Sequence, residues 1–359
     1  MENTNSKSKN KAALNKKATA IKLGIDVHAE SYVVVRQVDG AMPQPAQRFT
    51  PPKFKQWVKT QLDQAEQVYS CYEAGPFGYG LHRELNAMGV ANVVIRPQNW
   101  DEHGQGVKTD KTDALAMVQR LDRYVNGNPK ALAVVNPPTL DQELSRSRSR
   151  QREQFRQNRQ RLEAQGRTMM LNYGIRVKGK WWRGAQWDKL QGELDQRLLV
   201  MVRAFQEMVV AMDAKVTELT TEIEGVKTAS RIKGCGPLTE QILLREMVDW
   251  NRFTNRRQVA SLTGLCPGIH SSGNSHRQGH ITKHGKPRVR RILIELSLRV
   301  IRFQPEYQPV KKWAEELKSR SSATKKKAIV AIARHLAIDL WRINARGMDP
   351  KQVGLSLLA

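Results

Sequence analysis

The chain has 359 residues and a formal net charge of +26, from 60 Lys and Arg against 34 Asp and Glu. This length allows two or three domains that each bury a core, and the charge favours nucleic acid, before membrane, as the partner. No run of eighteen apolar residues occurs, so we expect no membrane-spanning helix and no membrane partner. The three cysteines are few and scattered, which argues against a disulfide framework or a zinc cluster and favours the cytoplasm.

The N-terminal region should be a basic arm followed by an α/β domain. Residues 1–20 contain no apolar segment of signal-peptide length and predict a disordered arm. Between residues 21 and 137, strand-like and helix-like segments alternate, which predicts an α/β sheet. The expected strands are IKLGID, SYVVVRQV, QVYSCYE, ANVVIRP and ALAVV, and TDALAMVQRL is expected to be a helix. The segment NPPT then marks a domain boundary.

Residues 138–228 should be a helical region. Its second half places apolar residues alternately four and three apart from Leu198 to Val226, which predicts coiled-coil packing. The partner could be residues 140–167 in a hairpin or a second subunit, and a single long helix on its own core is the alternative. A Trp cluster lies between these segments and either buries the hairpin tip or stacks on unpaired bases. The cluster comprises Trp181, Trp182 and Trp187.

Residues 229–359 should form a mainly helical domain that contacts phosphate. The segment KGCGPLTE resembles half of a helix–hairpin–helix, although a plain turn between helices is as consistent. Residues 252–302 hold eleven Lys and Arg against one acid, Glu295, and a further basic helix is expected within residues 323–343. The Arg-rich stretch 146–161 in the preceding region either follows an RNA backbone or forms a solvated helix face.

Four carboxylates predict a metal site in the α/β domain. Asp26 and Glu73 lie where strands end, and Asp110 and Asp113 are three residues apart on one helix face. Taken singly, these residues could be turn or capping residues. Together they offer the oxygen ligands that Mg²⁺, or Mn²⁺ as an alternative, needs to act on a phosphodiester.

A second candidate site lies in the segment CPGIHSSGNSHRQGHITKHGKPRVRR. Its Gly and His content predicts a flexible loop up to about residue 286, with two adjacent hydroxyls, Ser271 and Ser272, among many cations. A serine becomes a nucleophile when a base removes its proton, and phosphate binding without chemistry is the alternative. The candidate bases are His270, His276 and His280. The candidate nucleic-acid contacts are Lys233, Arg277, Lys283, Lys286, Arg288, Arg290 and Arg291.

Both sites lie in segments that resemble a known family. GIDVHAESY, YEAGPFGYGLHREL, VKTDKTDALAMV, the serine segment and KKKAIVAIARHLAIDLW resemble insertion-sequence transposases with a RuvC-like domain, relatives of the Piv DNA invertase. That family is understood as bridge-RNA-guided serine recombinases. The resemblance implies a RuvC/RNase H-like fold whose DEDD motif is Asp26, Glu73, Asp110 and Asp113.

The resemblance also implies a mechanism and partners. The serine of the Ser-Gly step, here Ser272, would form a covalent phosphoserine link with DNA, and Ser271 remains the alternative on chemistry alone. The implied partners are donor and target DNA, a structured noncoding guide RNA and further copies of the chain in a dimer or tetramer. The setting would be the bacterial cytoplasm, in association with the nucleoid.

Two other functions remain open from the residues. A metal-dependent Holliday-junction endonuclease would use the carboxylates alone and leave no protein–DNA adduct. A non-catalytic nucleic-acid-binding scaffold would bind in a steeply salt-dependent way and be indifferent to Mg²⁺.

Overall fold

The computed structural model describes residues 17–98, 109–226, 231–272 and 275–358, without the side chains at 231, 270–272, 275, 276 and 278. The chain divides into two compact units, Met1–Pro137 and Pro138–Ala359, which are described separately. Among the described residues, no helix is both long enough and apolar enough to cross a membrane.

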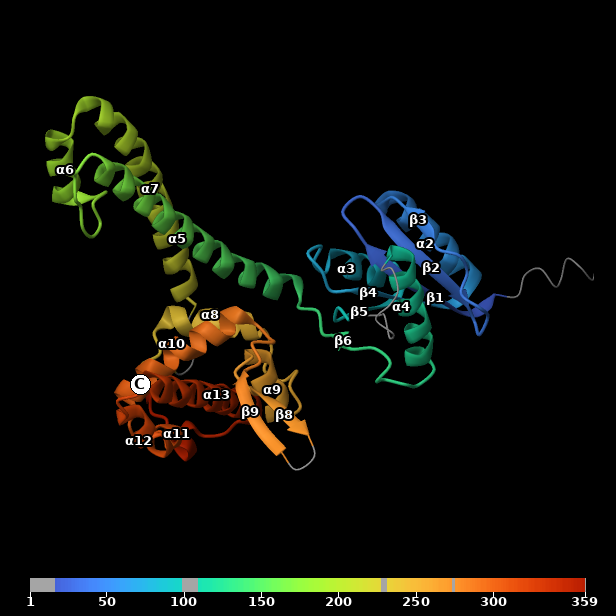
Figure 1. Ribbon diagram of the computed structural model, residues 1–359. Helices are drawn as coiled ribbons and strands as arrows, with labels where there is room; N and C mark the ends of the chain where they lie inside the picture. Colours follow the sequence, from blue (N-terminus) through green and yellow to red (C-terminus); the bar gives the residue numbers. More distant parts are fainter. Residues whose placement is uncertain (1–16, 99–108, 227–230, 273–274, 359) are drawn as a thin grey trace, which may run out of the picture. The chain divides into compact units, whose positions relative to one another are not determined.

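The first unit is built on a six-stranded mixed sheet with the strand order β3-β2-β1-β4-β5-β6 (Figure 1). Its strands are β1 (Ala18–Val27), β2 (Tyr32–Val38), β3 (Gln47–Phe49), β4 (Ala65–Glu73), β5 (Ala91–Ile95) and β6 (Val134–Val135). β1 pairs antiparallel with β2 and parallel with β4, and β4 pairs parallel with β5. The expected strands are therefore confirmed, although β1 begins at Ala18 rather than Ile21 and only Val134–Val135 of the segment ALAVV form a strand.

Helices cover both faces of this sheet because β1 and β2 are apolar on both faces. Their side chains alternate between the faces, and α2 (Pro51–Gln64) and α3 (Gly80–Ala87) pack on the face that carries Leu23 and Val34. α4 (Asp110–Val125) covers the other face, where Val33 packs against it. A mixed α/β unit is thus confirmed, and its RuvC-like character remains a prediction.

Gly24 brings α4 unusually close to β1. A Cβ atom at this position would lie 2.2 Å from the backbone oxygen of Ala114 and 2.6 Å from the backbone nitrogen of Val118. Real Cβ atoms do not approach backbone so closely, so the helix can lie this near the strand only above a glycine. The consequence is that the first turn of α4 lies beside the end of β1.

The second unit begins with a helical hairpin. α5 (Leu140–Asn172) and α7 (Gln196–Glu224) pack along each other, joined through α6 (Gly184–Glu193). The four–three spacing from Leu198 to Val226 marks nine apolar positions. Six of them are buried and face inward: Leu198, Val202, Val209, Val216, Leu219 and Ile223. Pairing with α5 within the chain is therefore the arrangement observed, and coiled-coil geometry remains a prediction.

The Trp cluster forms the core of the hairpin tip. Trp181 and Trp182 are 0% and 2% exposed, and Trp187 is also buried. Trp181 packs directly over Gly166 of α5 and donates its indole N–H to the Glu163 carbonyl at 3.0 Å. Buried rings cannot stack on bases, so the base-stacking interpretation was wrong and the hairpin-tip interpretation was right.

The remainder of the second unit is a helical core with one β-hairpin. The elements are β7 (Arg231–Ile232), α8 (Pro237–Met247), α9 (Arg256–Thr263), β8 (Pro267–Ser272), β9 (Ser275–Ile281), α10 (Pro287–Phe303), α11 (Gln308–Lys312), α12 (Ala314–Lys318), α13 (Ser322–Arg346), a 3₁₀ turn (Pro350–Val353) and β10 (Leu357–Leu358). The expected flexible loop is wrong in part, because β8 and β9 pair as an antiparallel ladder across it. Cross-strand backbone hydrogen bonds order this Gly- and His-rich segment without help from apolar side chains.

Candidate functional site

Two carboxylates and a histidine meet at one edge of the first unit's sheet. Asp26 Oδ2 lies 3.1 Å and Asp110 Oδ2 lies 3.4 Å from His28 Nε2. One ligand atom from each of the three residues falls within 4.8 Å of the others, so the group could hold a metal ion. Asp26 comes from the end of β1 and Asp110 from the first turn of α4, which the Gly24 contact brings together.

The start of α4 is fixed by a capping box. The Thr109 side chain accepts from the Thr112 backbone N–H, and the Thr112 side chain accepts from the Thr109 N–H. The exposed backbone N–H groups of a helix start favour carboxylates in the first turn, where Asp110 and Asp113 lie. Arg48 of β3 donates to Asp110 Oδ2 at 3.1 Å. The helix start therefore presents both aspartates at a defined place.

The electrostatics of Asp26 favour a bound cation. Burial raises the pKa of its carboxyl, and the nearby charges of Asp110 and Asp113 raise it further, while His28 opposes them. Gathered carboxylates of this kind repel one another when ionised, and a divalent cation would relieve that repulsion. Asp26 is half-buried and Asp110 is 41% exposed, so an ion could reach the group from solvent.

Glu73 lies at the same edge of the sheet as Asp26. The ladder between β1 and β4 pairs Ile25 with Tyr72, and Asp26 and Glu73 each follow by one residue. One Glu73 oxygen accepts from the Gln98 backbone N–H at 3.2 Å, and Glu73 is not one of the three residues whose ligand atoms meet. The backbone thus places Glu73 beside the group, with one oxygen held by the segment after β5.

His28 is the site residue that the sequence interpretation missed. It follows Asp26 by two residues at a strand end, a spacing that places two side chains on the same face. The segment GIDVH therefore contains a signal for an Asp–His pair.

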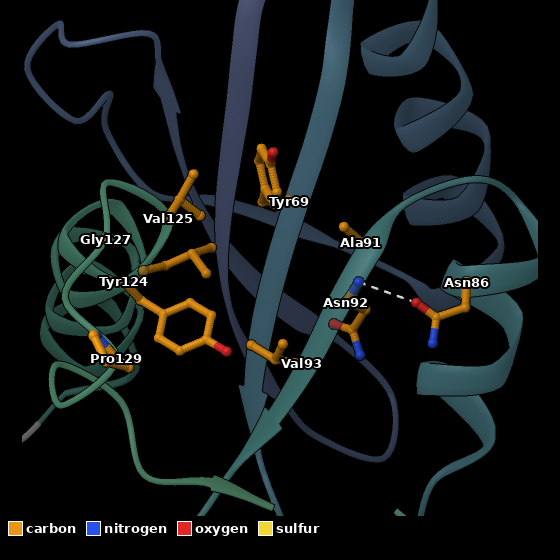
Figure 2. Close-up of a pocket in the computed structure, with 10 residues that line it drawn as sticks. Tyr69, Asn86, Ala91, Asn92, Val93, Tyr124, Val125, Gly127 and Pro129 are labelled. Carbon is orange, nitrogen blue, oxygen red and sulfur yellow. Dashed lines mark hydrogen bonds between the residues drawn. The ribbon is translucent and has the colours of Figure 1, made fainter. Parts of the chain in front are cut away.

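The first unit also contains a cavity of about 480 Å³ that is separate from the carboxylates (Figure 2). Tyr69, Asn92 and Tyr124 line it, and Tyr124 lies near the end of α4. Asp110 begins that helix, so about 20 Å of helix separates the two places at 1.5 Å per residue. Asp26, Asp110 and His28 therefore lie at an open edge of the sheet, outside this cavity.

The serine candidates lie at the end of β8. The ladder pairs Ser271 with His276 and Ser272 with Ser275, and the side chains of all four residues lie outside the described part of the structure. Gly273 is also outside the described residues. What the backbone establishes is that Ser271 and Ser272 lie in the last two pairs of a two-stranded antiparallel ladder.

The seven predicted nucleic-acid contacts fall into two groups. The side chains of Lys233, Arg277, Lys283 and Arg291 are exposed. Lys286 instead donates to the Glu246 carbonyl at 2.6 Å, Arg288 to the Ser149 carbonyl at 2.7 Å, and Arg290 to the Lys283 carbonyl at 3.1 Å. Burial, with the charge of Arg252 next, lowers the pKa of Lys286 to about 8. Lys286, Arg288 and Arg290 therefore donate hydrogen bonds to the protein's own backbone.

Comparison with known proteins identifies the family. The model of the transposase IS116/IS110/IS902 family matches residues 226–311, a range that contains the whole β8–β9 hairpin. The protein y4qE of Sinorhizobium fredii, named as a transposase, is 30% identical over 77% of this chain and 75% of its own length. The chain belongs to the IS116/IS110/IS902 family of transposases.

Other relatives carry the same assignment along most of the chain. The transposase for insertion sequence element IS1533 of Leptospira borgpetersenii is 26% identical over 77% of this chain and 84% of its own length. That for IS1328 of Yersinia enterocolitica is 23% identical over 90% and 97%. This transposase is therefore an enzyme that cuts and joins DNA, and the non-catalytic scaffold hypothesis is set aside.

Proposed function

We propose that this transposase mobilises an insertion sequence by cutting and rejoining DNA strands through a covalent phosphoserine link at Ser272, assisted by a divalent cation at Asp26, Glu73, Asp110 and Asp113. The observation that carries the metal part is the meeting of Asp26, Asp110 and His28 ligand atoms within 4.8 Å. The proposed role of Ser272 is supported by its position, since this residue lies within residues 226–311, which match the family model.

The donor set fits a hard cation with one nitrogen ligand. Asp26 and Asp110 each offer an oxygen, Asp113 adds negative charge, and Glu73 follows the last β1–β4 ladder pair at the same register position as Asp26. Mg²⁺ or Mn²⁺ held there would supply Lewis-acid activation of a phosphodiester. The chain's own contribution is to hold the carboxylates close together, with Arg48 donating to Asp110.

At the second site, the chain would supply the nucleophile and positive charge. Ser272 Oγ attacks phosphorus, the Oγ–P bond forms as the bond to the leaving sugar oxygen breaks, and that oxygen takes up a proton. His270, His276 or His280 would accept the serine proton. The exposed Arg277 and Lys283 of the same segment would neutralise charge on the phosphoryl oxygens. A later sugar hydroxyl reverses the step and frees the serine, so no nucleotide cofactor is consumed.

We further propose the domain roles and partners that the resemblance implies. Residues 21–137 act as a RuvC-like domain, 138–228 as a coiled-coil region and 229–359 as the serine-containing domain. A structured noncoding RNA selects donor and target DNA, and a dimer or tetramer brings the two sites together in the nucleoid. The net charge of +26 supports polyanionic partners such as DNA and RNA.

The central test is a strand-exchange assay with the element's two ends and flanking DNA, combined with a search for a protein–DNA adduct. We expect Ser272→Ala to abolish both recombination and the adduct, whereas Ser271→Ala keeps the adduct. We expect Asp26→Asn to lower the rate by ~100-fold or more, since metal-site stabilisation is worth several kcal/mol. Asp63→Asn, an exposed carboxylate of the same unit, is the matched control.

The outcomes separate the two enzyme hypotheses. Full recombination by Ser272→Ala without any adduct would favour the metal-dependent junction endonuclease and overturn the phosphoserine proposal. A wild-type recombination rate for Asp26→Asn would instead overturn the proposed metal site. Sequencing of RNA that co-purifies with the protein, expressed with its flanking DNA, tests guidance: one enriched RNA from the flank is expected, and bulk cellular RNA alone would contradict it.

A further inference from the structure

The second unit contains a strongly cationic cavity between α9 and α13. Its volume is about 490 Å³, and no carboxylate lies among its lining residues. The residues that matter here are Arg256, Arg257, Arg334, Arg342, His335 and Cys266. Four guanidinium groups around one hollow repel one another unless an anion lies between them.

Within residues 17–98, 109–226, 231–272 and 275–358, a carboxylate balances one of these four charges. Arg342 donates to Asp339 Oδ1 at 2.9 Å, and Asp339 Oδ2 accepts from the buried Tyr307 hydroxyl at 2.7 Å. For Arg256, Arg257 and Arg334, no ion pair with a carboxylate occurs within the described parts of the chain. Burial, with the charge of Arg334 next, lowers the pKa of His335, which favours the neutral form of this ring. The cavity therefore keeps an excess of positive charge.

The chemistry of these groups identifies the anion. A guanidinium presents a planar pair of N–H donors that matches two oxygens of a phosphate or of a carboxylate. The enzyme's established substrate, DNA, carries a phosphate at every nucleotide. A backbone phosphate is thus the ligand that both the cavity and the activity favour.

The cavity lies at the base of the hairpin that carries Ser272. Cys266 immediately precedes β8, and its carbonyl accepts from the Thr282 N–H at 2.8 Å, where the chain leaves β9. At about 3.3 Å per residue, Ser272 is at most ~20 Å from Cys266. That distance corresponds to about six base pairs of DNA at 3.4 Å each. A phosphate held in the cavity would fix the DNA at a set distance from the serine.

We propose that the cavity between α9 and α13 is a DNA phosphate-binding site that positions the substrate on the β8–β9 hairpin. Arg256, Arg257 and Arg334 hold the phosphate, and they act as positioning residues and not as catalytic ones. The inference goes beyond the phosphoserine mechanism and depends only on DNA being the substrate.

Cys266 provides a probe of the cavity in the unmodified protein. It is partly exposed, whereas Cys71 and Cys235 are buried and should not react in the folded chain. The full-length protein is treated with N-ethylmaleimide, with and without saturating duplex DNA, and alkylation of each cysteine is followed by mass spectrometry. We expect DNA to slow alkylation of Cys266 several-fold.

A double variant links this protection to the arginines. In Arg256→Gln/Arg334→Gln, DNA at saturating concentration should no longer protect Cys266, and the slope of log affinity against log salt should fall by about 1 for each phosphate that the variant no longer neutralises. The lysine version, Arg256→Lys/Arg334→Lys, should restore part of the slope. Arg148→Gln/Arg197→Gln is the control, since it also removes two positive charges, here from exposed side chains that pair with Glu222 and Asp195.

The proposal is overturned if saturating DNA leaves Cys266 alkylation unchanged, or if the double glutamine variant keeps both the protection and the wild-type salt slope. Protection by duplex RNA of equal length, without protection by DNA, would overturn the assignment to DNA. The alkylation assay requires DNA binding but no DNA cleavage, so Ser272→Ala should behave like the wild type. A failure of the phosphoserine mechanism would therefore leave this result untouched.

Discussion

In the first unit, Asp26 shares a sheet edge with Asp110 and Asp113, whereas in the second unit Glu246 is enclosed by Arg150, Arg288 and Lys286. Burial raises the pKa of Asp26, and the neighbouring carboxylates raise it further. Burial also acts to raise the pKa of Glu246, but hydrogen bonds and charge from Arg150 hold it below its usual range. Two carboxylates withdrawn from solvent thus have pKa values shifted in opposite directions.

The difference shows which carboxylate stabilises the fold. Glu246 of α8 accepts two hydrogen bonds of 3.0 Å from Arg150 of α5, and Arg288 of α10 lies 3.5 Å away, so three helices meet at one fully buried side chain. Asp26 has only the partial compensation of His28, and its pKa remains raised. A site that is destabilised when empty is typical of functional groups. Substitutions at the two places should therefore have opposite consequences.

The largest effect is expected for Glu246→Gln. The neutral amide would leave three cations without their shared counter-charge, and breaking a buried ion pair in this way typically costs about 3–5 kcal/mol. Denaturant unfolding of the full chain, followed by far-UV circular dichroism, should show this loss in the transition of the second unit. Metal-dependent reactions at the first unit's carboxylates should not change in any protein that remains folded.

The control for this prediction also links two helices of the second unit. Glu222 of α7 pairs with Arg148 of α5 at 2.9 Å, but both side chains are more than two-fifths exposed. Solvent screens such a pair, so Glu222→Gln should cost far less stability than Glu246→Gln. Equal losses for the two variants would contradict the view that Glu246 is the structural carboxylate.

An intermediate effect is expected for Gly24→Ala. The added methyl carbon would collide with the backbone of α4, so the helix must move away from β1, at a cost of about 1–3 kcal/mol. The same shift moves Asp110 away from Asp26 and should weaken binding of Mn²⁺, measured by calorimetry. Gly40→Ala is the matched control, because nothing lies within 4 Å of its added carbon. Unchanged stability and Mn²⁺ affinity would show that α4 does not need its close approach.

Much of the fold could be predicted because it depends on local periodicity. The alternation of apolar residues marked β1, β2, β4 and β5, and the four–three spacing marked the inward face of α7. Strand ends at Asp26 and Glu73 followed from the same pattern, since the apolar runs stop there. These features depend on residues that are close in the sequence, so they can be predicted without knowledge of tertiary contacts.

Features that depend on distant contacts could not be predicted. Glu246 is one acid within an ordinary amphipathic helix, and only the packing of three helices makes it an ion-pair centre. The β8–β9 hairpin is held by its backbone ladder, which leaves no periodic apolar signal in a Gly- and His-rich segment. The cationic cavity combines α9 with residues of α13 that lie far along the chain.

The smallest expected effect is a change in how the free energy of unfolding depends on pH. The pKa of Asp26 is raised in the folded state above its ordinary value of 3.8, so the folded chain holds this proton more tightly than the unfolded chain does. As pH rises from about 3.8 through the folded pKa, Asp26 ionises beside Asp110 and Asp113, and its contribution lowers the free energy of unfolding. With a chelator present, Asp26→Asn should therefore gain stability relative to the wild type across that window, whereas Asp63→Asn should follow the wild-type curve. Added Mg²⁺ should reduce the difference, because a cation favours the ionised carboxylate. Parallel stability curves for Asp26→Asn and the wild type would mean that burial and the neighbouring carboxylates do not destabilise the ionised form of Asp26.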